Sequence, residues 1–279
     1  MSKGFLIYAE NKEGVDYIEQ AYALALSIKF SQQEVNSVSL VTNDPVQEKY
    51  SKVFDNIIPI PWYNTQGTEL AAEHRWKLYH ATPYEETIVL DADMLVLEDI
   101  STWWNHCSNF DILYCSKIKN YKNECIVEDA VHRKTFIENN LSNPYCALHY
   151  FKKSEKSYEF YKVLEFVINN WEWAYSKFAP VNYQNWLSMD LSVAIAIELS
   201  GMHDVIDNTS PLEFVHMKPA IQNWPIVPEI WTNAVQYYLN NSGEFFVGNI
   251  KQTKIFHYVE KNFLTPKLLK QLEELNYGR

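Results

Sequence analysis

The chain has 279 residues, of which 47% are hydrophobic and 21% are charged, so it can bury a large core and is expected to be globular. Its formal net charge of −11 disfavours binding to a nucleic-acid backbone or to an anionic membrane surface, because both require clustered Lys and Arg. The four cysteines have no metal-binding spacing, the N-terminal apolar run is too short for a signal peptide, and no stretch approaches the ~18 apolar residues of a membrane span. We therefore expect reduced thiols and a cytoplasmic protein, located in the host cytoplasm if the source is viral.

The first hundred residues alternate between short apolar runs and segments with helical spacing of apolar side chains. This pattern predicts strands over residues 5–9, 37–42, 57–60 and 87–90, and helices over 15–30, 46–53 and 69–80. Such alternation predicts an α/β fold with a mostly parallel sheet and helices on both faces. Ligands in these sheets bind beyond the carboxyl ends of the strands.

After residue 100 the pattern is less regular. It predicts strands over 110–116, 146–151, 213–216 and 254–258, and helices over 158–170, 187–199 and 265–275. The polar segment 117–143 has mixed charge and indicates an insertion or lid, with a possible helix over 128–139. The chain has no internal repeat and no Gly/Ser linker.

Residues 88–97 form an apolar stretch that is interrupted only by Asp91 and Asp93. An unpaired carboxylate is costly to bury, so a buried strand that carries two of them implies a partner. Residues i and i+2 of an extended chain project to the same face, so both carboxylates can approach one cation. Mg²⁺ and Mn²⁺ prefer oxygen ligands and usually keep a substrate phosphate in their shell. The motif therefore predicts a divalent metal bound against a diphosphate.

Glycine-rich phosphate loops are absent from the sequence. The chain has 7 glycines and contains neither G-x-G-x-x-G nor G-x-x-x-x-G-K-[ST], which excludes the usual nicotinamide-binding and P-loop interpretations. A nucleotidyltransferase of similar fold is an alternative, but residues 9–14 are acidic and lack the glycine-rich basic loop of those enzymes.

Residues 84–100 resemble the metal-binding segment of the GT-A fold glycosyltransferases of the glycogenin and bacterial galactosyltransferase type, glycosyltransferase family 8. The resemblance covers residues 4–100 well and is weak beyond them. It implies a GT-A domain over 1–279, with a nucleotide-binding half (1–93), an acceptor half with C-terminal closure (94–279) and a smaller C-terminal sheet. It also implies retaining transfer of a hexose from a nucleotide-diphosphate sugar, usually UDP-linked, to a glycan or other hydroxyl acceptor, with Mn²⁺ (or Mg²⁺).

The resemblance also assigns site residues. Nucleotide-sugar contacts are implied for Tyr8, Ala9, Asn11, Tyr17, Arg75, Lys77, Asp91, Ala92 and Lys261. Arg75 is the expected cation beside the diphosphate, with Lys77 as the alternative if a two-residue gap falls here. Asp91, Asp93 and a late histidine are the implied metal ligands. His257 is favoured over His216 because its distance from Asp190 is closer to the family's spacing.

Asp190 matches the acidic residue that lies near the donor sugar in the family, and it is the second implied catalytic residue beside Arg75. The family's Gln after this residue is Leu191 here, and its Asn-Ser-Gly strand entry is replaced by residues 145–147, Tyr-Cys-Ala. These departures leave the donor sugar open and favour, as a further alternative, a degenerate nucleotide-sugar-binding protein without turnover. An aromatic and polar set suited to stacking on an acceptor sugar comprises Tyr183, Gln184, Trp186, Trp224 and Trp231.

Overall fold

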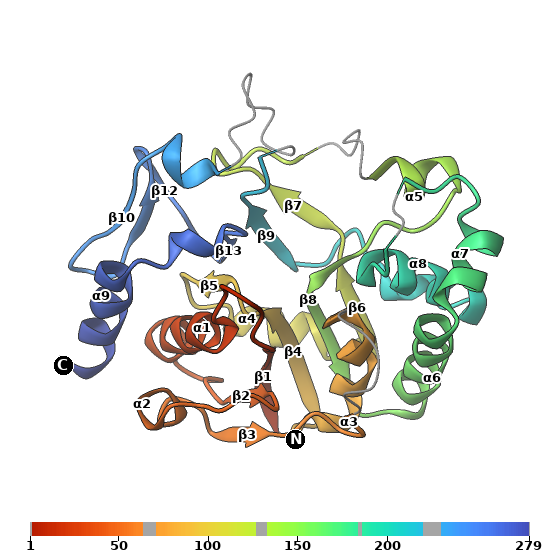
Figure 1. Cartoon of the computed structure of the whole chain (residues 1–279), viewed down its shortest axis with the longest axis horizontal. Coiled ribbons are helices and arrows are strands. Elements are labelled where there is room, and N and C mark those ends of the chain that lie inside the picture. Colours follow the sequence, from red (N-terminus) through yellow and green to blue (C-terminus); the bar gives the residue numbers. More distant parts are fainter. Residues whose placement is uncertain (1, 64–70, 127–132, 184–185, 220–229, 279) are drawn as a thin grey trace.

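The computed structural model describes residues 2–63, 71–126, 133–183, 186–219 and 230–278, and its centre is a six-stranded sheet of order β3-β2-β1-β4-β8-β6 (Figure 1). The strands of this sheet are β1 (Lys3–Tyr8), β2 (Val38–Val41), β3 (Asn56–Ile58), β4 (Glu86–Asp91), β6 (Ile112–Cys115) and β8 (Tyr145–Lys152). The first four lie parallel, whereas β8 runs antiparallel to both β4 and β6. The predicted mostly parallel α/β sheet is confirmed.

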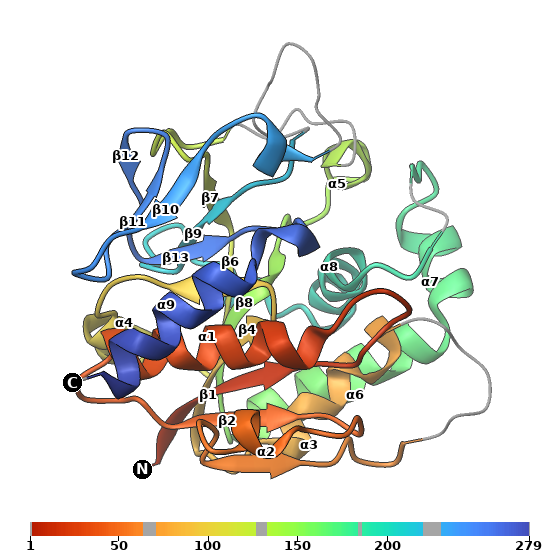
Figure 2. The same ribbon diagram turned by 60° about the vertical axis from the view of Figure 1, so that its left-hand side comes forward.

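Helices cover both faces of this sheet, which explains why its central strands are continuous apolar runs. On one face α1 (Tyr17–Ser31) packs beside the C-terminal helix α9 (Pro266–Tyr277), as Figure 2 shows. On the other face lie α6 (Glu155–Asn169) and α8 (Met189–Ser200), which pack against each other. Helix α1 begins where Asp16 accepts a hydrogen bond from the Glu19 amide, a standard N-cap.

Two smaller sheets stand above the carboxyl ends of the central strands (Figure 1). A four-stranded sheet has the order β5-β13-β9-β7, and a three-stranded sheet has the order β10-β11-β12. Their strands are β5 (Met94–Val96), β7 (Lys117–Lys119), β9 (Glu213–His216), β10 (Tyr237–Leu239), β11 (Phe245–Val247), β12 (Ile250–Lys251) and β13 (Ile255–His257). The predicted C-terminal sheet is present, but it also recruits β5 and β7 from earlier in the chain.

The remaining elements are short. They are the helices α2 (Glu48–Ser51), α3 (Leu78–Ala81), α4 (Ser101–Cys107), α5 (Lys134–Glu138) and α7 (Trp171–Phe178), and the 3₁₀ turns η1 (Ala71–Lys77), η3 (His203–Val205), η4 (Trp231–Asn233) and η5 (Lys261–Phe263). The helix predicted over 69–80 is mostly the 3₁₀ segment η1. The predicted helix over 128–139 is reduced to α5, and its residues 128–132 lie outside the described part. No helix in the described residues has the length and apolar character needed to cross a membrane.

A buried histidine lies in the middle of β8. His149 stacks on Tyr114 at 4.8 Å, its Nδ1 is 3.1 Å from the Cys146 carbonyl and its Nε2 is 3.3 Å from the Tyr161 hydroxyl. These partners fit a neutral ring that donates from Nδ1 and accepts at Nε2. Burial, only partly opposed by the Cys146 carbonyl, lowers the pKa of His149 to about 4.

This histidine should make folding sensitive to mild acid. The unfolded chain takes up the proton near the ordinary pKa of ~6.5, whereas the folded chain resists it until about pH 4. Stability from neutral His149 is thus fully present above pH ~6.5 and is lost on acidification towards pH ~4, by about 3 kcal/mol. When the free energy of unfolding is measured with urea across this pH range, it should change less with pH in His149→Gln than in the wild type. The exposed His203→Gln should retain the wild-type slope, and parallel profiles for H149Q and wild type would contradict the assignment.

Candidate active site

The site forms where the central sheet meets the four-stranded sheet. Strand β4 ends at Asp91, which lies in register beside Tyr8 at the end of the parallel strand β1. The chain then turns through Ala92 and Asp93 into β5, which pairs with β13 so that Met94 lies opposite His257. The backbone amide that follows His257 donates to the Asp93 carbonyl at 3.2 Å. Strand register therefore brings a late histidine to the Asp-x-Asp turn.

Asp91, Asp93 and His257 form a potential metal-binding cluster. One ligand atom from each lies within 4.8 Å of the other two, and His257 Nε2 is 3.2 Å from Asp93 Oδ1. The Nδ1 atom of His257 is buried and has no hydrogen-bond partner in the described part of the chain. Two carboxylates and an imidazole suit Mn²⁺ or Mg²⁺ with open positions left for phosphate oxygens. The residues present therefore fit a divalent cation.

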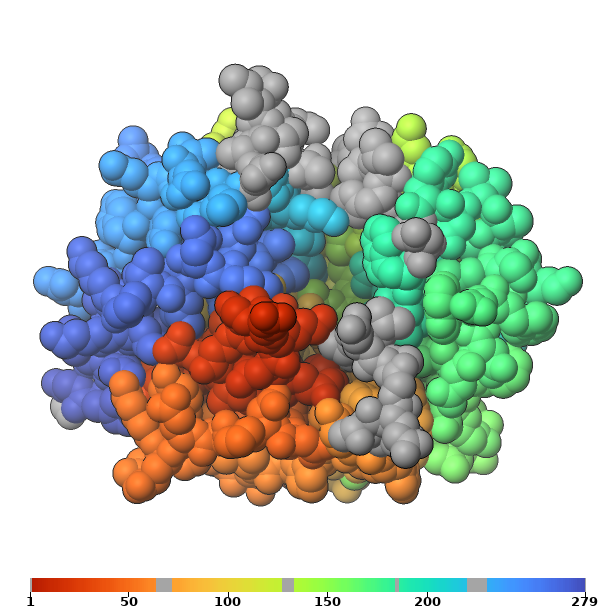
Figure 3. Space-filling view, viewed as in Figure 1, coloured from red at the N-terminus to blue at the C-terminus, as the bar shows by residue number. Residues whose placement is uncertain are grey.

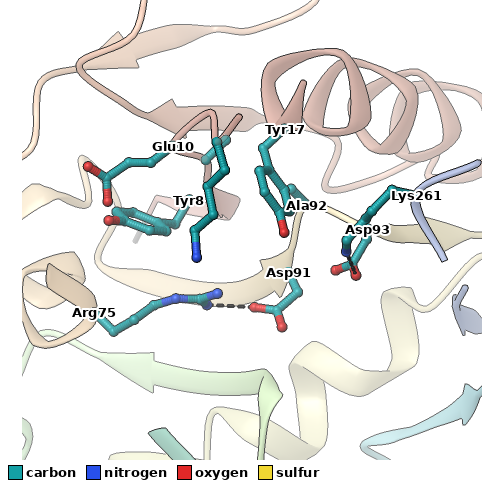
Figure 4. Close-up of a pocket in the computed structure, with 10 residues that line it drawn as sticks. Tyr8, Glu10, Tyr17, Arg75, Asp91, Ala92, Asp93 and Lys261 are labelled. Atoms are coloured by element: carbon teal, nitrogen blue, oxygen red, sulfur yellow. Dashed lines mark hydrogen bonds and ion pairs between the residues drawn. The ribbon is translucent and has the colours of Figure 1, made fainter. Parts of the chain in front are cut away.

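Each aspartate is also paired with a cation that rests on a tyrosine ring (Figure 4). Arg75 Nη1 is 2.5 Å from Asp91 Oδ1, and the guanidinium lies 5.1 Å from the ring centre of Tyr8. Lys261 Nζ is 2.5 Å from Asp93 Oδ2 and 5.0 Å from the ring centre of Tyr17. Such cation–π contacts stabilise a charge where water is scarce. The two cations thus flank the turn, one from the N-terminal half and one from the C-terminal end.

These pairings determine the protonation of the buried aspartate. Burial by itself raises the pKa of Asp93, but the charges and hydrogen bonds of His257 and Lys261 outweigh it and hold the pKa well below its usual range. Asp93 is therefore an anion at neutral pH, as a metal ligand must be.

The cluster faces a cavity of about 170 Å³. Its walls are Tyr8, Ala9, Glu10, Lys12, Tyr17, Arg75, Asp91, Ala92, Asp93 and Lys261. The space-filling view shows a hollow where the red N-terminal segment meets the blue C-terminal segment (Figure 3). Most of the residues expected to contact a nucleotide sugar therefore line one cavity, together with Glu10 and Lys12, which the sequence did not single out.

Two expected residues do not line this cavity. The exposed Asn11 uses its side-chain oxygen to accept from the Ile18 amide at 3.1 Å, which ties the loop to the start of α1. Lys77 lies at the end of η1 and donates to the Trp62 carbonyl at 2.9 Å. Of the alternatives Arg75 and Lys77, the structure brings only Arg75 to Asp91.

A second cavity, of about 150 Å³, adjoins the first and shares Arg75 and Asp91 with it. Asp190, at the start of α8, lines this second cavity. Its Oδ2 accepts from Arg133 Nη2 at 2.7 Å and its Oδ1 accepts from the Cys146 amide at 2.8 Å. The Asp190 carboxylate is thus held in one orientation, in a cavity that Asp91 and His257 also line.

Arg133 is a site residue that sequence reasoning missed. It is buried, donates to the Pro144 carbonyl at 3.2 Å, and stacks its guanidinium 3.8 Å from the ring centre of Tyr145. It belongs to the polar segment 117–143, where nothing in the sequence separates a buried arginine from a solvated one.

The two candidate histidines are neighbours. His216 on β9 lies in register beside His257 on β13, and their rings stack at 4.8 Å. Both line the second cavity, but His257 also contacts Asp93, whereas His216 accepts from the Lys218 amide at 3.3 Å. The geometry therefore agrees with the preference for His257, and the similar surroundings of the two in sequence follow from their matching positions on paired strands.

Of the aromatic and polar set proposed for an acceptor, Tyr183, Trp186 and Trp231 lie in the described residues. Trp231 is fully buried and donates to the Tyr258 carbonyl at 2.7 Å, so its predicted stacking role is wrong. Tyr183 and Trp186 are exposed, and Tyr183 donates to Glu138 at 2.8 Å. Gln184 and Trp224 lie outside the described residues.

Comparison by sequence with family profiles and with curated proteins gives no match. Solved structures do match. The bifunctional glycosyltransferase WbbM superposes with a TM-score of 0.54 at 10% identity, over 99% of this chain and 50% of WbbM. The galactosyltransferase LgtC, solved with donor and acceptor sugar analogues, gives 0.51 at 13% identity, over 98% of this chain and 95% of LgtC. Glycosyltransferase GlyE of Streptococcus pneumoniae superposes with a TM-score of 0.48 at 12% sequence identity, over 99% of this chain and 61% of GlyE.

The chain thus spans half the length of WbbM and about three fifths of GlyE. Identities of 10% and 13% to WbbM and LgtC establish a shared fold and nothing finer. The chain has the GT-A fold of these glycosyltransferases, as its sequence predicted.

Proposed function

We propose that the protein transfers a sugar from a nucleotide-diphosphate sugar to a glycan or other hydroxyl acceptor, with Mn²⁺ or Mg²⁺. The observation that carries this proposal is the convergence of Asp91, Asp93 and His257 at the end of β4, between the cations Arg75 and Lys261. Metal ligands flanked by two cations fit a diphosphate better than any neutral ligand. The fold shared with LgtC and the resemblance to family 8 favour UDP and a hexose as the donor.

Asp91, Asp93 and His257 would hold the metal, which when bound neutralises charge on the departing diphosphate. Arg75 can grip a phosphate through two parallel N–H groups, and Lys261 adds a point charge on the opposite side. Tyr8, Ala9 and Tyr17 line the part of the cavity proposed for the nucleoside. Residues 1–93 would therefore bind the nucleotide, and 94–279 would complete the site and bind the acceptor.

The second cavity would hold the donor sugar. Among the described residues that line it, the carboxylates are Asp91 and Asp190, and an arginine holds each of them. Neither is free to act as a nucleophile, which favours attack by the acceptor hydroxyl on the face from which the diphosphate leaves, with retention. Asp190 would orient the sugar hydroxyls and stabilise positive charge at the reacting carbon.

Nucleotide binding should depend on metal and on Asp93. In a thermal-shift comparison of UDP, GDP, CDP and ADP with and without Mn²⁺, UDP should raise the melting temperature by about 5 °C only when Mn²⁺ is present at saturating ligand. In Asp93→Asn the Mn²⁺-dependent rise in melting temperature should be lost, because the substitution removes an anionic metal ligand. The control Asp204→Asn, an exposed aspartate paired with Lys156, should respond like wild type.

Each other outcome of this experiment has a meaning. A full Mn²⁺ response in D93N would refute the metal role, and a response to another nucleotide would keep the site and change the donor. Release of UDP from UDP-hexoses then separates an enzyme from a binding protein without turnover. Absence of any nucleotide response would contradict the proposal.

Lys261 should compete with metal when no diphosphate is present, because it occupies Asp93 Oδ2. Lys261→Met should strengthen binding of Mn²⁺ alone by about tenfold or more, since it removes a positive charge beside the ligands. The same change should weaken UDP binding in the presence of Mn²⁺ by about tenfold, since a charged contact to phosphate is lost. Isothermal titration measures both. Lys12→Met, which removes another cation of the cavity, should leave Mn²⁺ binding near wild type, and weaker Mn²⁺ binding in K261M would count against competition.

A further inference from the structure

A further cleft, larger than the two cavities of the candidate active site, lies beside η1. Its volume is about 490 Å³, with η1 and α3 along one wall and α6 along the other. Consecutive residues of η1 face different sites. Arg75 pairs with Asp91 in the candidate active site, whereas Trp76 and Lys77 line the cleft. The proposed transfer reaction uses none of the residues that line the cleft.

One wall presents tryptophan. The rings of Trp62 and Trp76 stack at 5.9 Å with 15° between their planes, and His80 packs edge-on against Trp62 at 4.9 Å. Trp76 is buried, but Trp62 is 66% exposed, the largest exposed fraction among the exposed large apolar side chains of the described residues. The exposed face of its ring borders the cleft and is available to a ligand.

The exposed Trp62 ring is held by a strained backbone and by a buried lysine, both of which are energetically unfavourable. Trp62 has a φ of 49°, in the left-handed region that bulky residues avoid. The buried Lys77 donates its ammonium to the Trp62 carbonyl at 2.9 Å and lies 5.7 Å from the Trp76 ring centre. Burying a lysine is unfavourable, and burial lowers its pKa. Strain and a buried charge together position a ring that packs on Trp76 and His80 and keeps one side open to solvent.

The opposite wall is helix α6, which presents Tyr158 near its start and polar side chains further along. Helix α6 contributes Glu165 and Asn169, which offer a carboxylate and an amide that both donates and accepts. Among the described residues that line the cleft, Lys77 and Lys162 stand against Glu73 and Glu165. That balance disfavours a phosphate or a nucleic acid, and the charged and amide groups of α6 disfavour an apolar peptide. A flat apolar ring opposite planar hydrogen-bonding groups matches a pyranose, which has an apolar C–H face and a rim of hydroxyls.

We propose that this cleft binds a neutral oligosaccharide, separately from the Asp91 site. Its volume exceeds that needed for one sugar ring and lies within the usual range for ligand pockets. Trp62 is the stacking platform, Lys77 is the residue that positions it, and Glu165 and Asn169 bind hydroxyls. Binding needs neither metal nor nucleotide, so it is tested independently of the transfer reaction.

To test this, the full chain is titrated with maltohexaose, cellohexaose, chitohexaose and mannohexaose, and binding is measured by tryptophan fluorescence and by calorimetry. Wild type should bind at least one of them in the absence of Mn²⁺ and UDP. Trp62→Ala should weaken that binding by roughly tenfold or more, since an aromatic platform is lost. Glu165→Gln should also weaken it. The matched control is Trp173→Ala, another exposed tryptophan that does not line the cleft, and it should bind like wild type.

Three results would overturn the proposal. The first is that no oligosaccharide of the panel binds wild type at millimolar concentration. The second is that W62A binds as tightly as wild type, or that W173A is weakened equally. The third is that UDP with Mn²⁺ displaces the oligosaccharide or that D93N abolishes its binding, which would place it at the Asp91 site. Circular dichroism and melting temperature of each variant separate lost binding from lost folding.

Discussion

Two carboxylates at the end of a buried strand are the constraint on which this structure depends. Asp91 ends a strand that is buried up to Leu90, and the buried Asp93 follows in the turn, where an unpaired charge would be costly. The fold brings Arg75 from η1 and Lys261 from the C-terminal segment to pair with them. The turn between the central sheet and the four-stranded sheet is therefore held by Arg75 from η1 and Lys261 from η5, and by His257 from β13.

The supports of these ion pairs explain several otherwise separate features. Parallel pairing of β1 with β4 places Tyr8 under Arg75, and the start of α1 places Tyr17 under Lys261. Antiparallel pairing of β5 with β13 fixes His257 against Asp93. The two cations balance the two carboxylates before any ligand arrives, and the ion pairs hold both side chains in place. A diphosphate with its cation would enter a site whose charges are already arranged for it, which limits the reorganisation that binding requires.

The middle strands β1, β2 and β4 could be predicted from sequence because they are buried on both faces and form apolar runs. The same runs exposed the metal motif, since Asp91 and Asp93 interrupt one of them. The strands β5 and β7 were not predicted as separate strands, because β5 continues an apolar run past the aspartates and β7 has a lysine on each side of Ile118. The site residues that come from irregular segments were missed or left open because those segments have no periodic pattern. Arg133 lies in a polar insertion, and the choice between Arg75 and Lys77 depended on the turn of a 3₁₀ helix.

The departures from the family motif fall where the structure can accommodate them. Cys146 replaces the central residue of the Asn-Ser-Gly entry, yet it holds Asp190 through its backbone amide, which any residue except proline supplies. Tyr145, beside it, is covered by the buried guanidinium of Arg133, which also binds Asp190. The substituted side chains thus change the wall of the second cavity while the anchor of its carboxylate is kept. If the proposed function holds, this arrangement favours a changed donor sugar over a lost reaction, because the buried arginine still holds the carboxylate proposed to face the sugar.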